Sequence, residues 1–323
     1  MENQKNLIIL TGPTAAGKTA LSIRLAKAVG GEIISADSMQ VYRHMDIGSA
    51  KVTHEEMDGV CHHLIDVLEP DEEFHVVKFQ EMAKKAIKQI YDKGKIPILV
   101  GGTGFYIQSV LYDIDFTQTD EDEDFREQLE NLAREKGNEV LFEKLRRIDP
   151  KACENLHPNN VKRVIRAIEF YEKSGGKRIS EHNEEQHEKP SPYCYTYFVL
   201  TDDRAILYEK INRRVDNMLE NGLVEEVMRL REMGCSKDLV SMQGLGYKEI
   251  LDYLEGACAL EDAVYRIKRD TRHFAKRQIT WFKRERDVTW VSRQDYRAED
   301  GKEDERILAY MLQTLRERHG LII

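Results

Sequence analysis

Short apolar runs alternate with amphipathic segments along much of the chain, and the two patterns predict different elements. A strand buried on both faces shows a continuous apolar run, whereas a helix that packs on a sheet has an apolar residue every three or four positions. The alternation therefore predicts an α/β fold with a parallel sheet flanked by helices. The expected strands are residues 7–10, a short run that begins at residue 32, residues 96–100 and residues 195–200. The first expected helix begins near residue 18, and the others span residues 74–93, 202–221 and 305–320.

The middle of the chain has a different pattern. Residues 113–139 carry eleven acidic and three basic side chains, and apolar positions from Leu129 to Phe170 recur at helical intervals. This predicts a mainly helical insertion at residues 115–194, which divides an α/β core made of residues 1–114 and 195–323. The polar segment 181–192 has no apolar periodicity, so it is expected to be a surface loop.

Composition is typical of a globular protein and narrows the range of partners. The 323 residues suffice for two structural units, and 41% of them are hydrophobic. A net charge of −9 argues against nucleic-acid binding through the overall field of the protein, while a local basic surface is compatible with it. No segment has the roughly 18 apolar residues of a membrane span, so a cytoplasmic protein without a membrane partner is expected. A monomer is expected.

The cysteines indicate free thiols. The chain has five, which are widely scattered and form no CxxC pair. No group of cysteines and histidines has zinc-finger spacing, so no zinc is expected. The adjacent His62 and His63 would point to opposite faces of an extended segment, which favours structural roles over a shared metal.

A phosphate-binding motif follows the first apolar run. Residues 12–19 read GPTAAGKT, which matches GxxxxGK followed by Ser or Thr. The backbone N–H groups of such a loop and the N-terminus of the next helix bind an anion, typically a nucleotide such as ATP. Lys18 supplies a positive charge for phosphate, and the hydroxyl of Thr19 can bind Mg2+. The expected phosphate-binding residues are Gly12, Thr14, Ala15, Ala16, Gly17, Lys18 and Thr19.

Polar side chains also follow two other predicted strands. Ligands bind at the carboxyl ends of the strands in an open parallel sheet, so these side chains should face the phosphate loop. Asp37 is a candidate base, and an Asp at such a position is equally typical of a turn cap. Thr103, within the glycine-rich segment 101–104, either points into the same crevice or belongs to a tight strand-to-helix connection. The polar residues after the second strand are Ser35, Asp37, Ser38 and Gln40.

Two groups of basic residues are candidates for phosphate contacts. Arg213 and Arg214 are adjacent on a predicted helix, where either one clamps a phosphate or both are solvated. Residues 266–286 hold nine basic and two acidic side chains, with aromatic residues interleaved. This pattern is typical of a nucleic-acid-binding surface, although the aromatic residues Phe274, Trp281 and Phe282 also fit the buried face of an amphipathic helix.

Seven short motifs, taken together, resemble the tRNA dimethylallyltransferases, also called tRNA isopentenyltransferases. They span residues 7 to about 283 in the order found in that family, and the ordered set is specific although each motif alone is weak. Eukaryotic members carry an added zinc finger, for which this chain lacks the cysteine spacing, so it is similar to the bacterial type. The motifs are residues 12–19, 35–42, 61–66, 101–106, 157–160, 243–247 and 275–282.

The resemblance implies a P-loop NTPase-like fold and a prenyl transfer. A dimethylallyl group would move from dimethylallyl diphosphate to N6 of the adenine 3′-adjacent to the anticodon in certain tRNAs, with Mg2+ as cofactor. It implies Asp37 as general base, Thr103 beside the reacting centre and Arg214 on the diphosphate, with Arg213 as second choice. The helical insertion would bind the anticodon stem-loop, and the implied tRNA contacts are Ser35, Ser38, Gln40, Lys276, Arg277 and Gln278.

Two other functions are compatible with the residues alone. A small-molecule kinase with a P-loop has the same fold pattern and would transfer a phosphoryl group from ATP. A non-catalytic RNA-binding protein regulated by a nucleotide would also combine a phosphate loop with a basic segment. The identity of the donor and the presence of a product distinguish the three.

Overall fold

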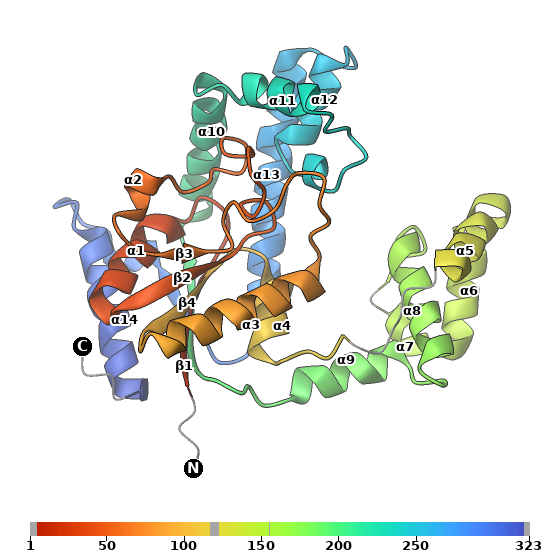
Figure 1. The fold of residues 1–323 in the computed structure, drawn as a ribbon, viewed down its shortest axis with the longest axis horizontal. Helices are drawn as coiled ribbons and strands as arrows, with labels where there is room; N and C mark the ends of the chain where they lie inside the picture. The colour runs from red at the N-terminus through yellow and green to blue at the C-terminus, as the bar shows by residue number, and fades with distance from the viewer. Residues whose placement is uncertain (1–4, 117–122, 155, 320–323) are drawn as a thin grey trace. The chain divides into compact units, whose positions relative to one another are not determined.

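The computed structural model describes residues 5–116, 123–154 and 156–319. The chain divides into an α/β unit, Met1–Val110 with Tyr193–Ile323, and a helical unit, Leu111–Pro192 (Figure 1). The helical unit begins four residues before the expected position 115 and ends two residues before the expected position 194. The outer limits of the expected core, residues 1 and 323, lie outside the described residues.

The α/β unit is built on a sheet that has six strands within the described residues, all parallel, in the order β3-β2-β4-β1-β5-β6. The predicted parallel sheet is confirmed. β6 was not expected, because only one of its five side chains is buried and its sequence, VTWVS, is not a continuous apolar run. The strands are β1 (Asn6–Thr11), β2 (Gly31–Ala36), β3 (His62–His63), β4 (Ile96–Gly101), β5 (Cys194–Thr201) and β6 (Val288–Ser292).

Helices pack on the faces of the sheet, and others lie beyond the carboxyl ends of its strands. Successive strand side chains alternate between the two faces, so Ile8 and Leu10 of β1 pack in the cluster formed with α1 and α14, whereas Leu7 and Ile9 point to the other face. The long α13 runs beside α10 and α12 (Figure 1). The helices of this unit are α1 (Lys18–Val29), α2 (His54–Met57), α3 (Val76–Asp92), α4 (Gly104–Leu111), α10 (Arg204–Glu220), α11 (Leu223–Glu232), α12 (Tyr247–Leu254), α13 (Leu260–Phe282) and α14 (Glu303–His319), with short 3-10 turns at Ser241–Gln243 and Arg293–Tyr296.

The helical unit has its own core. Apolar side chains of three of its helices, among them Leu129, Leu145 and Ile168, pack together and are buried. Its helices are α5 (Glu123–Lys136), α6 (Asn138–Ile148), α7 (Pro150–Cys153), α8 (Val161–Lys173) and α9 (Ile179–Glu188). Across the described residues of both units, no helix has the length and hydrophobicity to cross a membrane.

The segment 181–192 was expected to be a loop, and this was wrong because α9 occupies most of it. The buried positions of α9 are polar, so they give no apolar periodicity. His182 is buried against the ring of Phe170, with ring centroids 5.0 Å apart. Gln186 is buried four residues later, and its Oε1 accepts a hydrogen bond from the backbone N–H of Asp115 at 3.1 Å.

Candidate active site at the carboxyl edge of the sheet

The carboxyl ends of β1, β2 and β4 meet at one edge of the sheet. Their last residues are in register, because Thr11 of β1 and Ala36 of β2 both pair with Gly101 of β4. The hydroxyl of Thr11 donates to the carbonyl of Gly101 at 2.7 Å, and the N–H of Thr103 donates to the carbonyl of Ala36 at 3.3 Å. The three polar segments that follow these strands in the sequence are therefore neighbours in the fold.

The loop between β1 and α1 has the shape of a phosphate cradle. Gly12 has a φ of +146°, and a Cβ at this position would lie 2.1 Å from the carbonyl oxygen of Leu200 in β5. Only glycine fits so close to a neighbouring backbone. α1 begins at Lys18, directly after the left-handed Gly17, so the N-terminus of a 12-residue helix adjoins the loop. This is the arrangement that binds anions.

The ammonium group of Lys18 folds back over the cradle. Its Nζ donates to the carbonyl oxygens of Gly12 at 3.0 Å and Pro13 at 2.8 Å. Burial and the positive charge of Arg214, opposed by Asp37, lower the pKa of Lys18 to about 8. An entering phosphate would add negative charge beside this cation and would favour its charged form.

The two adjacent arginines of α10 lie in opposite environments. Arg214 is in the cradle, where its Nη1 donates to the hydroxyl of Thr14 at 3.4 Å, and burial lowers its pKa. Arg213 forms an ion pair with Glu209 at 2.6 Å on the surface, where their side chains are 69% and 68% exposed. The structure therefore places Arg214, and not Arg213, beside the phosphate loop.

The two carboxylate oxygens of Asp37 have different surroundings. Oδ1 accepts hydrogen bonds from the N–H groups of Met39 at 2.8 Å and Gln40 at 3.4 Å, so Asp37 does cap the turn after β2. Oδ2 has no hydrogen-bond partner within the described part of the chain. The turn thus fixes the orientation of the carboxylate and leaves one oxygen available to a substrate.

A pocket at this edge joins the phosphate loop to the turn after β2. Ser35 is buried, and the Nε2 of Gln40 donates to the carbonyl of Ala50 at 3.3 Å. Thr14, Ser38, Thr103 and Arg214 lie near this region but are not part of the pocket lining. The polar lining residues include Lys18, Thr19, Ser35, Asp37, Gln40 and His62.

The oxygen atoms in this pocket fit Mg2+, which prefers hydroxyl, carboxylate and water ligands. Thr19 is in the first turn of α1 and is exposed toward the solvent. Asp37 lines the same pocket and has the free Oδ2 oxygen. The Thr19 hydroxyl would therefore hold the ion together with water, and Oδ2 of Asp37 is left for a substrate.

Gln278 of α13 bridges the two glycine-rich loops. Its Oε1 accepts from the N–H of Thr14 at 2.8 Å, and its Nε2 donates to the carbonyl of Gly102 at 3.0 Å. The side chain is buried, and a Cβ at Gly102 would lie 2.2 Å from Nε2. The amide of Gln278 therefore holds the phosphate loop against the segment 101–104, and the tRNA contact expected of this residue stays a prediction. The Thr14 N–H consequently faces Gln278 rather than a bound anion.

Arg293, which follows β6 and contacts the cradle, was not predicted from the sequence. Its Nη1 donates to the carbonyl of Ala16 at 3.4 Å, across 277 positions of the sequence, and lies 2.8 Å from where a Cβ on Gly17 would be. Ion pairs with Glu303 and Asp304 anchor the guanidinium on α14. No sequence motif surrounds residue 293, so the contact of Arg293 with the phosphate loop is known only from the structure.

The basic segment of α13 divides into paired and open cations. Lys276 and Arg277 are exposed and form no ion pair within the described residues, and the Arg277 guanidinium lies 5.7 Å from the ring centroid of Phe274. Phe282 is completely buried, so this aromatic side chain belongs to the core. Other cations of the segment are already paired: Arg266 with Asp252, Lys268 with Asp216, and Arg269 with Asp270.

Comparisons with known proteins agree on one family. A family model described as IPP transferase matches residues 40–285. A tRNA dimethylallyltransferase from Lachnoclostridium phytofermentans is 62% identical over 312 residues, which cover 97% of this chain and 98% of that protein. Another from Acetivibrio thermocellus is 52% identical over 295 residues, which cover 91% of this chain and 94% of that protein.

Solved structures support the same assignment. A tRNA isopentenylpyrophosphate transferase from Bacillus halodurans has 44% identity and a TM-score of 0.73, covering 98% of this chain and 99% of that chain. A eukaryotic dimethylallyltransferase acting on tRNA has 31% identity and a TM-score of 0.81, covering 97% of this chain and 80% of that chain. These matches confirm the P-loop NTPase-like fold, and the family match covers more than half of the sequence. The chain belongs to the IPP transferase family.

Proposed function

We propose that this protein transfers a dimethylallyl group from dimethylallyl diphosphate to N6 of the adenine 3′-adjacent to the anticodon in certain tRNAs, releasing diphosphate. The observation that carries the proposal is the pocket shared by Lys18 and Thr19 of the cradle and by Asp37. A phosphate cradle beside an oriented carboxylate suits the displacement of diphosphate by a nucleophile that must lose a proton. The names of the relatives support the same reaction.

The cradle stabilises the leaving group. Negative charge grows on the diphosphate as the bond from the allylic carbon to oxygen breaks, and preorganised cations lower the energy of that state. Lys18 and Arg214 contact neutral oxygen atoms of the loop and have no acidic ion-pair partner in the described chain. Their charge is therefore available to the diphosphate. Mg2+ bound through Thr19 would add positive charge at the same oxygens.

Asp37 accepts the proton of the nucleophile. The exocyclic amine of adenine is a weak nucleophile because its lone pair is delocalised into the ring, so a carboxylate must take a proton as the new bond forms. Oδ2 of Asp37 is the free oxygen, while the backbone of Met39 and Gln40 holds Oδ1. Thr103, tied to the end of β2 through its N–H, lies beside the reacting centre.

The target adenine leaves the stack of the anticodon loop to reach Asp37. Extrusion of a base costs less from a single-stranded loop than from a duplex. Ser35 and Gln40 line the pocket and contact the extruded base, and Ser38 belongs to the same turn. Lys276 and Arg277 on the exposed face of α13 bind phosphate groups of the loop.

The helical unit binds the anticodon stem. Its helix α8 carries Lys162, Arg163 and Arg166 as exposed cations, and none of the three forms an ion pair within the described residues. Unpaired cations on one short surface are suited to the phosphate backbone of a nucleic acid.

Incubation of the purified protein with an unmodified tRNA transcript and dimethylallyl diphosphate, followed by nucleoside analysis, tests the proposal. We expect N6-dimethylallyladenosine from a transcript with adenine 3′ of the anticodon. The matched control is the same transcript with guanine at that position, which should give none. Absence of product from the adenine transcript contradicts the proposal.

The same preparation separates the two other functions. Transfer of label from γ-labelled ATP, without prenylated nucleoside, would indicate a kinase. Binding of tRNA that is unaffected by dimethylallyl diphosphate, without product in a single turnover, would indicate a non-catalytic RNA-binding protein.

A further inference from the structure

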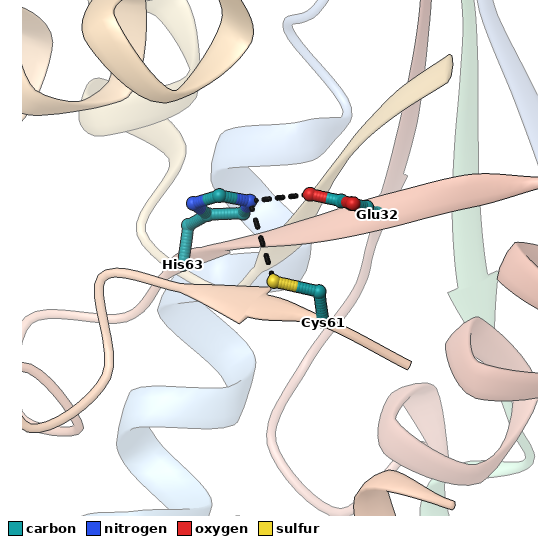
Figure 2. Close-up of side chains that lie close together, drawn as sticks. All are labelled: Glu32, Cys61 and His63. Atoms are coloured by element: carbon teal, nitrogen blue, oxygen red, sulfur yellow. Dashed lines mark hydrogen bonds and ion pairs between the residues drawn. The ribbon is translucent and has the colours of Figure 1, made fainter. Parts of the chain in front are cut away.

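A second cluster of reactive side chains lies where strands β2 and β3 begin. Glu32 is the second residue of β2, Cys61 directly precedes β3, and His63 ends it (Figure 2). The strands pair in parallel with Ile33 opposite His62, which places Glu32 opposite Cys61. Because side chains alternate along a strand, Glu32, Cys61 and His63 point to the same face of the sheet.

Three potential ligand atoms converge in this cluster. Nε2 of His63 lies 2.8 Å from Oε2 of Glu32 and 3.7 Å from Sγ of Cys61, as the dashed lines in Figure 2 show. One ligand atom from each residue lies within 4.8 Å of the other two, and no other such group of three occurs in the described chain. Tetrahedral zinc places its ligand atoms about 3.3–3.6 Å apart, so small side-chain rotations reach that geometry.

Two lysines currently neutralise the carboxylate. Lys93 donates to Glu32 at 2.9 and 3.1 Å, and Lys95 donates at 2.9 Å. Although burial opposes it, hydrogen bonds from these lysines and His63 lower the pKa of Glu32 to about 2. The Glu32 side chain is only 2% exposed, whereas the lysine side chains are 48% and 47% exposed. The lysines can therefore return to water when another cation reaches the carboxylate.

We propose that Glu32, Cys61 and His63 bind a divalent metal ion of zinc's class, with water as the fourth ligand. Carboxylate, thiolate and imidazole are the ligand types of zinc sites. Cys61 is exposed, so the ion enters from solvent, and the thiol proton leaves to solvent on binding. The two anionic ligands then balance the charge of the ion.

If it binds zinc, the proposed site would revise the expectation that the chain binds none. That expectation rested on the absence of finger spacing, which is uninformative when one ligand comes from a neighbouring strand. His62 and His63 do point apart, as predicted: His62 lines the pocket at the carboxyl edge while His63 contacts Glu32. A bound ion would join β2 to the two-residue β3 and stabilise the strand that carries His62.

Titration of the chelator-treated, full-length protein with Co2+ tests the site. We expect one ion per chain, with the near-ultraviolet absorption of a thiolate bound to Co2+, and displacement of that absorption by Zn2+. Cys61→Ser should abolish the absorption, and His63→Ala should weaken binding at least about tenfold. Cys153→Ser, in the helical unit, is the matched control and should leave both unchanged. An absent signal, or one retained in Cys61→Ser, overturns the proposal.

The lysines provide an independent test. Lys93→Gln combined with Lys95→Gln removes the competing cations, so Co2+ should bind several-fold more tightly. If the cluster serves only as an ion-pair network, Co2+ will not bind more tightly to this variant. The variant would then lose thermal stability, and Zn2+ would not restore it. That outcome also overturns the proposal.

Discussion

The protein holds positive charge in two different ways, in the phosphate cradle and along α13. Lys18 and Arg214 of the cradle are held by neutral oxygen atoms, and burial lowers the pKa of both. Lys276 and Arg277 of α13 are exposed to solvent. A partly buried cation that is held by neutral oxygen atoms favours the entry of a small anion, whereas exposed cations act together on a polyanion and are screened by salt. The first arrangement suits chemistry on diphosphate, and the second suits positioning of tRNA.

Loss of Asp37 should separate chemistry from tRNA binding more strongly than any other substitution proposed here. Asp37→Ala should lower prenyl transfer by about 10²–10⁴-fold, because the amine then has no base. Its tRNA affinity should stay near that of the wild type, since the exposed cations are untouched. Quantified prenylation under single-turnover conditions and filter binding of tRNA measure the two effects.

Asp37→Asn is the control that distinguishes a base from a turn cap. The amide oxygen can still accept from Met39 and Gln40, so the turn is kept while the base is lost. We expect the asparagine variant to be as inactive as the alanine variant. Near-normal turnover of the asparagine variant alone would show that Asp37 only caps the turn, and near-normal turnover of the alanine variant would show that neither role is needed.

The adjacent arginines of α10 offer a matched pair. Arg214→Gln should lower turnover by about 10²–10³-fold, because a preorganised charge at the leaving group is lost. Arg213→Gln removes an exposed ion pair with Glu209 and should change turnover by less than about twofold. Equal losses in single-turnover rates would contradict the placement of one arginine in the cradle.

The fold was largely predictable because continuous apolar runs mark buried parallel strands. The partly exposed β6 and the polar α9 were missed, since neither shows the hydrophobic pattern of its element. Lys18 and Asp37 could be placed together because both follow strands of one parallel sheet. Neither the bridge made by Gln278 nor the support from Arg293 could be foreseen, because these contacts join positions 264 and 277 residues apart.

The salt dependence of tRNA binding tests the role of the exposed cations of α13. Charge reversal of Lys276 and Arg277 to Glu should weaken tRNA binding by more than about tenfold and lower the slope of log affinity against log salt by about two. Charge reversal of Lys85 and Lys88, which are exposed on α3, is the matched control. An unchanged slope in the α13 variant would show that this surface faces away from tRNA.

The pH dependence of diphosphate binding tests the role of Lys18 in the phosphate cradle. The pKa of Lys18 is lowered to about 8, so Lys18 is charged below that pH and progressively neutral above it. Affinity for diphosphate analogues should be constant below pH 8 and fall up to about tenfold per unit above it. Lys18→Arg, which stays charged, should remove this fall. Calorimetric titration from pH 6.5 to 9.5 measures it, and a parallel decline in both proteins would refute the assignment.

The last expected effect is on stability and concerns a buried charge of opposite sign, beyond the end of α13. Glu285 is buried, which raises its pKa to about 7, while Gln108 donates to its Oε1 at 2.7 Å and opposes the shift. An unfolded Glu titrates near about 4.3, so between these values the folded state keeps a proton that the unfolded state releases, and stability falls as pH rises through this window. Glu285→Gln keeps an acceptor for Gln108 and removes this penalty, so at pH 8 it should stabilise the fold by an amount on the order of 2 kcal/mol, seen as a higher Tm.

At pH 4 the variant should melt like the wild type, and Glu261→Gln, on the exposed start of α13, should change neither value. A gain at pH 4 equal to that at pH 8 would mean that packing, and not the burial of a carboxylate, sets the effect.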